Sequence, residues 1–267
     1  MERFEPMCQT RWRGPHVVRT FFTIELMVEV EAEPNYERGV ALEDQPDATA
    51  IADSSLAKPR FRGLSHLLAF SSALTLAPLL IVFTPGIADR FIMAIYAVSI
   101  VGLFGISALY HRNHWSERGT LIMRRLDHSM IFVAIAATHT PIALIALPSV
   151  QGWTLFGIVW GGAVVGIAGR LFATNAPFWM VALPYVVVGW SSLTVVTAVW
   201  DSLGISASIL LFVGGGLYTF GAVIYALQRP NPWPKYFGYH EIFHVLTIAG
   251  ASCHYVVIAI FVRSLAG

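Results

Sequence analysis

The chain has 267 residues, of which 56% are apolar and 12% are charged, and its mean hydropathy is +0.64. A soluble domain carries about 25% charged residues, so this composition excludes an ordinary soluble protein and indicates an integral membrane protein. The net charge of +1 averages two unlike parts, because residues 1–57 hold 5 Lys/Arg and 11 Asp/Glu, whereas residues 58–267 hold 12 Lys/Arg and 5 Asp/Glu.

The acidic part comes first in the chain. Its best apolar stretch, TFFTIELMV, is shorter than the roughly 20 residues that a membrane span needs, and no small-residue cleavage site of a signal peptide follows it. An acidic composition with few aromatic residues is typical of disorder. We therefore expect a disordered acidic N-terminal segment over residues 1–57, followed by a membrane domain over residues 58–267. The two cysteines, Cys8 and Cys253, fall in different parts and indicate no disulfide framework.

Charged residues punctuate the membrane domain. Six long stretches contain none, and each can hold a span of about 20 apolar residues. The stretch from 128 to 169 is long enough for two spans and breaks at PSVQG (148–152). The sequence therefore predicts an all-α membrane protein with seven transmembrane helices, near residues 64–84, 88–111, 126–147, 152–170, 177–198, 206–227 and 241–263.

The basic residues of these connecting segments predict the orientation. With seven helices, the segments on the N-terminal side of the membrane hold 10 Lys/Arg, and the segments on the other side hold 2, Arg90 and Arg263. Because basic residues are concentrated in cytoplasmic loops, we expect the N-terminus inside, the C-terminus outside and a multi-pass protein of the cell membrane. No feature of the sequence indicates a nucleic-acid partner, and the oligomeric state is left open.

Polar side chains gather at the cytoplasmic ends of three predicted helices. Ser107 and His111 end the second helix, Asp127 starts the third, and HEIFH (240–244) starts the seventh. Residues four apart share a helix face, which applies to Ser107 with His111 and to His240 with His244. Polar groups within a membrane are costly and therefore mark candidate functional sites.

The residue types favour a metal site. Two imidazoles one turn apart can bind one ion, and a third histidine from a neighbouring helix completes the three-ligand arrangement of catalytic zinc. Asp127 is suited to orient a water or a ligand there. Glu241 lies within an H-E-x-x-H pattern, the zinc signature of many metalloproteases, and is a candidate general base.

Simpler interpretations stay open for each of these residues. Asp127 and Glu241 also fit as helix N-terminal carboxylates that the helix dipole favours, and Ser107 fits as a packing residue. His139 and His254 lie about 18 and 21 Å along their helices from Asp127 and His240, too far to bind the same ion. We expect both to bond neighbouring helices instead. His66, near the cytoplasmic end of the first helix, is a weaker candidate.

Several motifs spread over residues 60 to 265 form a specific combination, namely SALYH (107–111), LDHSMIF (126–132), THTP (138–141), GWSSL (189–193), GGGLYTFGAVIY (214–225) and HEIFHVLTIAGASCHY (240–255). In these motifs the chain resembles the hemolysin III family, the bacterial branch of the progestin and adipoQ receptors, within a superfamily of seven-helix membrane hydrolases that includes alkaline ceramidases.

This resemblance implies a zinc ion held by His111, His240 and His244, with Asp127 near a water on the zinc and Ser107 beside it. It also implies hydrolysis of lipid amides, with membrane lipids as substrates or ligands. The chain departs from the family in two places. RFRGLSHLLAF stands where members often carry an acidic-plus-Asn motif, and His139 stands where Tyr is usual.

Three functions are compatible with the polar cluster and with the resemblance. The first is a zinc-dependent lipid amide hydrolase, the second a membrane regulator or receptor with structural zinc, and the third a pore-forming cytolysin. The spans carry few polar side chains beyond the cluster, which argues against a pore. An intramembrane metalloprotease is disfavoured, because it needs a further acidic ligand downstream and no Asp or Glu follows Glu241.

Overall fold

A computed structural model describes residues 59–172 and 177–267, all of which lie in the second of the two units into which the chain divides, residues 49–267. The expected acidic segment over 1–57 lies outside the described residues. The helices of the second unit are α2 (Leu64–Val82), α3 (Ile87–Arg112), α4 (Glu117–Pro141), α5 (Ser149–Phe172), α6 (Phe178–Gly189), α7 (Val196–Leu227) and α8 (Tyr239–Val256). Short π-helical or 3₁₀ turns extend α4 (Ile142–Ala146), α6 (Trp190–Val195) and α8 (Val257–Val262 and Arg263–Leu265).

The outer surface of these helices is apolar. Large side chains such as Leu68, Val98 and Val165 are 62–73% exposed, whereas soluble monomers rarely expose large contiguous apolar patches. Six helical stretches among the described residues are long and apolar enough to cross a membrane. The chain is therefore a multi-pass membrane protein. The expected all-helical fold is confirmed for the described residues, with six stretches that can cross a membrane.

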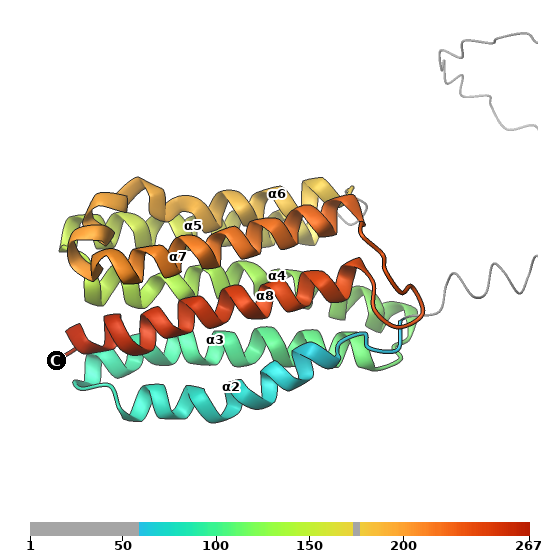
Figure 1. Ribbon diagram of the computed structural model, residues 1–267, viewed down its shortest axis with the longest axis horizontal. Coiled ribbons are helices and arrows are strands. Elements are labelled where there is room, and N and C mark those ends of the chain that lie inside the picture. The colour runs from blue at the N-terminus through green and yellow to red at the C-terminus, as the bar shows by residue number, and fades with distance from the viewer. Residues whose placement is uncertain (1–58, 173–176) are drawn as a thin grey trace, which may run out of the picture. The chain divides into compact units, whose positions relative to one another are not determined.

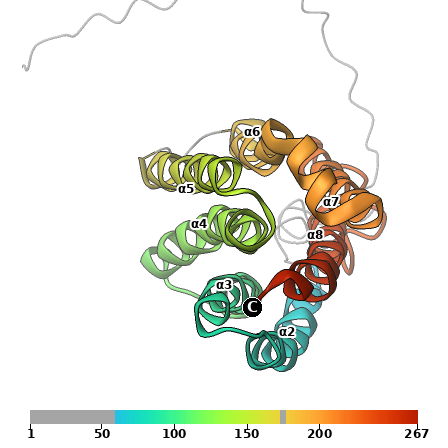
Figure 2. The same ribbon diagram turned by 90° about the vertical axis from the view of Figure 1, so that its left-hand side faces the viewer.

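The longest of the six stretches, Phe178–Leu227, has 50 residues and contains α6 and α7. A straight helix of that length would measure about 75 Å, more than twice the roughly 30 Å hydrocarbon core of a bilayer. The stretch is not straight, because a 3₁₀ turn follows α6 and Gly204 has a φ of 75° inside α7. Glycine adopts this backbone conformation without the clash of a Cβ atom. As a result α6 and α7 pack against each other (Figure 2).

One boundary differs clearly from its prediction. The third predicted helix was expected from about residue 126, but α4 begins at Glu117 after Ser116, whose side chain accepts a hydrogen bond from the Gly119 N–H at 3.2 Å. Charged residues mark the edge of the apolar core rather than the end of a helix. The charged first turns of α4, which include Arg118 and Arg124, are helical outside that edge.

Helices that follow one another in sequence lie side by side, and α8 also contacts α2 as well as α7 (Figure 1). Two glycines permit close approach within this arrangement. A Cβ atom on Gly166 would lie 2.2 Å from the Phe132 ring, and one on Gly214 would lie 2.5 Å from the His254 ring. The antiparallel order brings the end of α3, the start of α4 and the start of α8 to the same end of the bundle (Figure 1).

Candidate metal centre

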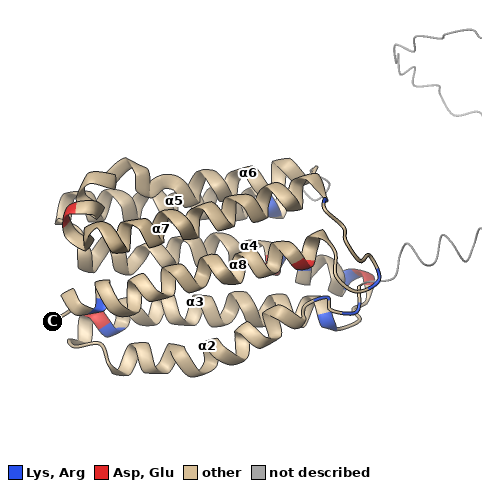
Figure 3. Ribbon diagram, viewed as in Figure 1, with Lys and Arg blue, Asp and Glu red and all other residues tan. Residues whose placement is uncertain are grey.

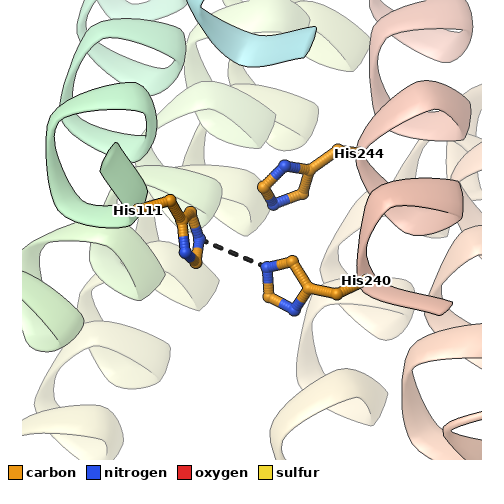
Figure 4. A group of neighbouring side chains, drawn as sticks. All are labelled: His111, His240 and His244. Carbon is orange, nitrogen blue, oxygen red and sulfur yellow. Dashed lines mark hydrogen bonds between the residues drawn. The ribbon is translucent and has the colours of Figure 1, made fainter. Parts of the chain in front are cut away.

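Three histidines converge at this end of the bundle. His111 lies in the last turn of α3, and His240 and His244 lie on successive turns of α8. Their rings point toward one another (Figure 4), and one nitrogen atom from each lies within 4.8 Å of the others. The Nε2 atoms of His111 and His240 are 3.2 Å apart. Two nitrogen ligands of one tetrahedral zinc ion, each at about 2.0 Å from it, are separated by about 3.3 Å. The geometry therefore fits a single metal ion.

The surroundings of the three rings support this fit. His111 and His244 are buried, His240 is half-buried, and the buried Nδ1 of His244 has no hydrogen-bond partner among the described residues. A buried polar atom without a partner costs free energy. Binding of a metal ion by the three rings would offset the free-energy cost of burying them. Imidazole nitrogen is a preferred ligand of zinc among several transition metals. The three histidines thus form a site that can hold a metal, and its donors are compatible with zinc.

Asp127 and Ser107 lie beside the three histidines. The Oδ2 of Asp127 is 3.8 Å from the Nε2 of His111, and the Ser107 hydroxyl is within hydrogen-bonding reach of the Asp127 carboxylate. Both side chains are buried, and both line a cavity that His240 and His244 also line. The five residues selected from the sequence, on α3, α4 and α8, are therefore brought together.

Glu241 is engaged in a different set of contacts. Its Oε1 pairs with the Nε of Arg62, and its Oε2 accepts a hydrogen bond of 2.7 Å from the Gly238 N–H. Arg62 follows a short segment whose Arg60 and Phe61 N–H groups bond the carbonyl oxygens of Lys235 and Tyr236, at 3.0 and 3.2 Å. Glu241 thus links the chain before α2 to the start of α8.

These contacts bear on the predicted role of Glu241. Each carboxylate oxygen holds one partner, so both oxygens of Glu241 are engaged in structural contacts. The sequence analysis did not identify Arg62 as the partner of Glu241. The one feature that sets Arg62 apart in the sequence is its position as the last cation before the first apolar span.

His66 lies closer to the centre than the sequence suggested. It is 3% exposed, and its ring stacks on that of His244 with a centroid separation of 3.8 Å and an interplanar angle of 9°. Neither of its ring nitrogens has a hydrogen-bond partner among the described residues. Because the two rings are stacked, the His66 ring lies over the face of the His244 ring. Its nitrogens do not belong to the group of three that converge, which come from His111, His240 and His244. His66 is therefore an additional polar side chain in the wall of the same cavity.

A second pair of side chains ties neighbouring helices together at this end. The Nη2 of Arg170, on α5, lies 2.8 Å from the Nδ1 of His128, on α4, and the Tyr185 hydroxyl donates to the His128 carbonyl at 3.2 Å. Sequence reasoning did not connect these residues. The sequence carries one signal for this pair, because Arg170 is the single charged residue between residues 128 and 200.

The cavity beside the metal centre continues into the bundle. It shares Leu103, Phe243 and Thr247 with an apolar central cavity of about 100 Å³, which in turn shares His139 and His254 with a cavity further along. The metal centre thus lies at one end of a long, mainly apolar space.

The two distant histidines differ in their partners. The Nε2 of His254 lies 3.2 Å from the carbonyl oxygen of Leu211 on α7, which confirms the expected bond to a neighbouring helix. The Nδ1 of His139 lies 2.8 Å from the carbonyl oxygen of Ile135 in its own helix. The His139 ring also faces the backbone of Gly189 at the end of α6, so both histidines reach a neighbouring helix as expected.

The chain is similar in sequence to a known protein family and to two known proteins. A family model described as "Haemolysin-III related" matches residues 54–255. The chain is 31% identical over 168 residues to "Hemolysin-3" of Bacillus cereus, covering 63% of this chain and 74% of that protein. It is 33% identical over 159 residues to "Hemolysin-3 homolog" of Bacillus subtilis (strain 168), covering 59% of this chain and 71% of that protein. All five residues of the cluster lie within the matched range.

Proposed function

The chain belongs to the haemolysin-III-related family, and on that premise we propose that it is a zinc-dependent hydrolase of lipid amides. The observation that carries the proposal is the convergence of His111, His240 and His244 beside Asp127, at the end of an apolar cavity. Three nitrogen ligands with a nearby carboxylate are the protein part of many hydrolytic zinc sites.

The residues of the site would divide the work as follows. The three histidines would hold a zinc ion, which would supply polarisation of a carbonyl group and activation of water. Asp127 is the candidate to take up a proton and to return it to the leaving amine, and Ser107 orients Asp127 through their hydrogen bond. The apolar cavity holds the acyl chain and keeps the carbonyl in position, since a fixed orientation lowers the entropic part of the barrier.

We also propose seven membrane passes, with the N-terminus and the metal centre on the cytoplasmic side and the C-terminus outside. The length and the break of the stretch Phe178–Leu227 support two passes there rather than one. The basic side chains support the orientation, because Figure 3 shows most of them at the end of the bundle where α8 begins.

Metal content tests the proposal first. Protein purified in detergent without chelators is expected to contain about one zinc per chain by mass spectrometry, and His240→Ala is expected to lose it. His114→Ala, in the exposed segment between α3 and α4, is the matched control and should keep the metal. Metal-loaded protein is then assayed on ceramide-like lipid amides. Wild-type protein without metal would contradict the proposal.

A cytolysin is the second candidate, because the two similar proteins are both named as hemolysins. Lysis of erythrocytes by the purified protein, unchanged when zinc is removed, would favour this function. The central cavity argues against it, since its wall is mainly apolar and a water-filled pore needs polar groups.

A further inference from the structure

The far part of the internal space contains a second set of buried polar groups. Four polar side chains, Thr138, His139, Trp190 and His254, line both the central cavity and the cavity beyond it, and we call them the junction. His254 follows His244 by ten residues on α8, which corresponds to about 15 Å along a helix. Polar groups at such a depth are costly unless they serve packing or function.

The hydrogen bond of the His254 ring fixes which of its two nitrogens carries the proton. The Nδ1 of His139 and the Nε2 of His254 each face a backbone carbonyl oxygen, those of Ile135 and Leu211. A carbonyl only accepts hydrogen bonds, so a neutral ring donates from that nitrogen and carries a lone pair on the other. The Nδ1 of His254 is therefore an acceptor, whereas the His139 ring faces a second carbonyl, that of Gly189, and offers no free acceptor.

The other two junction residues have also used their protons. The Thr138 hydroxyl donates to the Ala134 carbonyl at 2.7 Å, and the indole N–H of Trp190 donates to the Thr219 hydroxyl at 2.9 Å. Each proton on the four side chains is thus committed inside the protein. What the junction offers to a ligand is acceptor capacity, from the Nδ1 of His254 and the Thr138 oxygen.

We propose that the junction binds a hydroxyl group carried along the acyl chain of the lipid, so that the preferred substrates are hydroxylated lipid amides. This inference rests on the proposed function, because it assumes that the chain extends from the metal centre into the central cavity. A hydroxyl donates the hydrogen bond that the junction lacks, whereas a plain methylene chain leaves the buried acceptors without a partner. A keto group would add one more acceptor.

Binding of two fatty acids tests the inference without requiring turnover. Octadecanoic acid and its analogue with a hydroxyl near the middle of the chain compete with a fluorescent fatty acid for the zinc-loaded protein in detergent micelles. The hydroxylated chain is expected to bind about fivefold more tightly, which corresponds to one net hydrogen bond of about 1 kcal/mol. His254→Phe keeps a ring but removes the acceptor, so it should reduce this preference without weakening the binding of octadecanoic acid.

Thr247→Val is the matched control, because Thr247 lines the central cavity but not the junction, and its hydroxyl donates to the Phe243 carbonyl. This variant should keep the fivefold preference. Equal affinities in the wild type, as expected if water molecules already satisfy the acceptors, would overturn the inference and leave the proposed function standing. Binding of neither chain would overturn both. A preference without any amide hydrolysis would support the junction site and contradict the hydrolase.

Discussion

The position of Asp127 separates a catalytic zinc site from a structural one. Its carboxylate lies 3.8 Å from the His111 ring, beyond the length of a direct hydrogen bond, and it lines the cavity. Asp127→Asn keeps the size of the side chain and removes its capacity to hold a proton. If the centre is catalytic, we expect kcat for lipid amides to fall by about 10²–10⁴-fold, while the zinc content stays at the wild-type level.

The control for this substitution is Asp201→Asn, at an exposed position in the first half of α7, which should change neither value. Loss of zinc in Asp127→Asn would mean that the carboxylate supports the ligands instead of the reaction. Full activity in the variant would remove Asp127 from the mechanism.

The contacts of Glu241 predict a linking role instead of a direct chemical one. The Arg62–Glu241 pair joins residues 179 positions apart and connects the segment before α2 to the turn of α8 that carries His240. Glu241→Gln and Arg62→Gln should each lower zinc affinity about tenfold, as is common for groups that support metal ligands indirectly. The double variant should be no weaker than either single variant, because both remove the same interaction.

Titration with a competing zinc chelator measures these affinities, and hydrolysis of a lipid amide provides a second reading. If Arg62→Gln keeps its turnover and Glu241→Gln loses it entirely, Glu241 acts as a base and the linking role is refuted.

At the scale of helices, glycine positions determine how closely α4 and α5 pack. A Cβ atom on Gly152 would lie 2.1 Å from the backbone carbonyl oxygen of Ala143, and a backbone atom cannot rotate away as a side chain can. Gly152→Ala should therefore destabilise the protein by about 1–3 kcal/mol. Gly157→Ala is the matched control on the same helix, because no heavy atom outside the helix lies within 4 Å of its Cβ position.

Thermal unfolding in detergent, followed by the circular dichroism of the helices, compares the two variants. The midpoint should fall in Gly152→Ala and should be unchanged or slightly higher in Gly157→Ala, since alanine is the better helix former. Equal midpoints would show that the chain absorbs the added methyl group by a backbone shift.

The sequence predicts more of the site than of the helix ends. Helical spacing and the ends of the predicted helices put Ser107, His111, Asp127, His240 and His244 into one candidate cluster, and the structure brings their side chains together; their roles stay predictions. The Arg62–Glu241 and His128–Arg170 pairs were not found, because they join residues far apart in the chain. The early start of α4 and the turn near Gly204 depend on capping and packing, which charge patterns do not report.

At the scale of the whole molecule, the number of passes determines on which side the C-terminus lies. The segment between α3 and α4, which contains His114, is expected in the cytoplasm, because the basic residues Arg112 and Arg118 flank it. If α6 and α7 each cross the membrane, five helices separate this segment from Ser264, which then lies outside. If the stretch Phe178–Leu227 crosses only once, four crossings separate the two positions and both lie on the same side.

Cysteine labelling in intact cells distinguishes these arrangements. In a background in which Cys8 and Cys253 are replaced by serine, a membrane-impermeant maleimide should label Ser264→Cys in intact cells. It should label His114→Cys only after the cells are permeabilised, because that segment faces the cytoplasm. Labelling of both positions under the same condition would mean an even number of crossings between them and would refute the seven-pass arrangement. The reverse pattern would keep seven passes and move the metal centre to the outer side, where its substrates would be lipids of the outer leaflet.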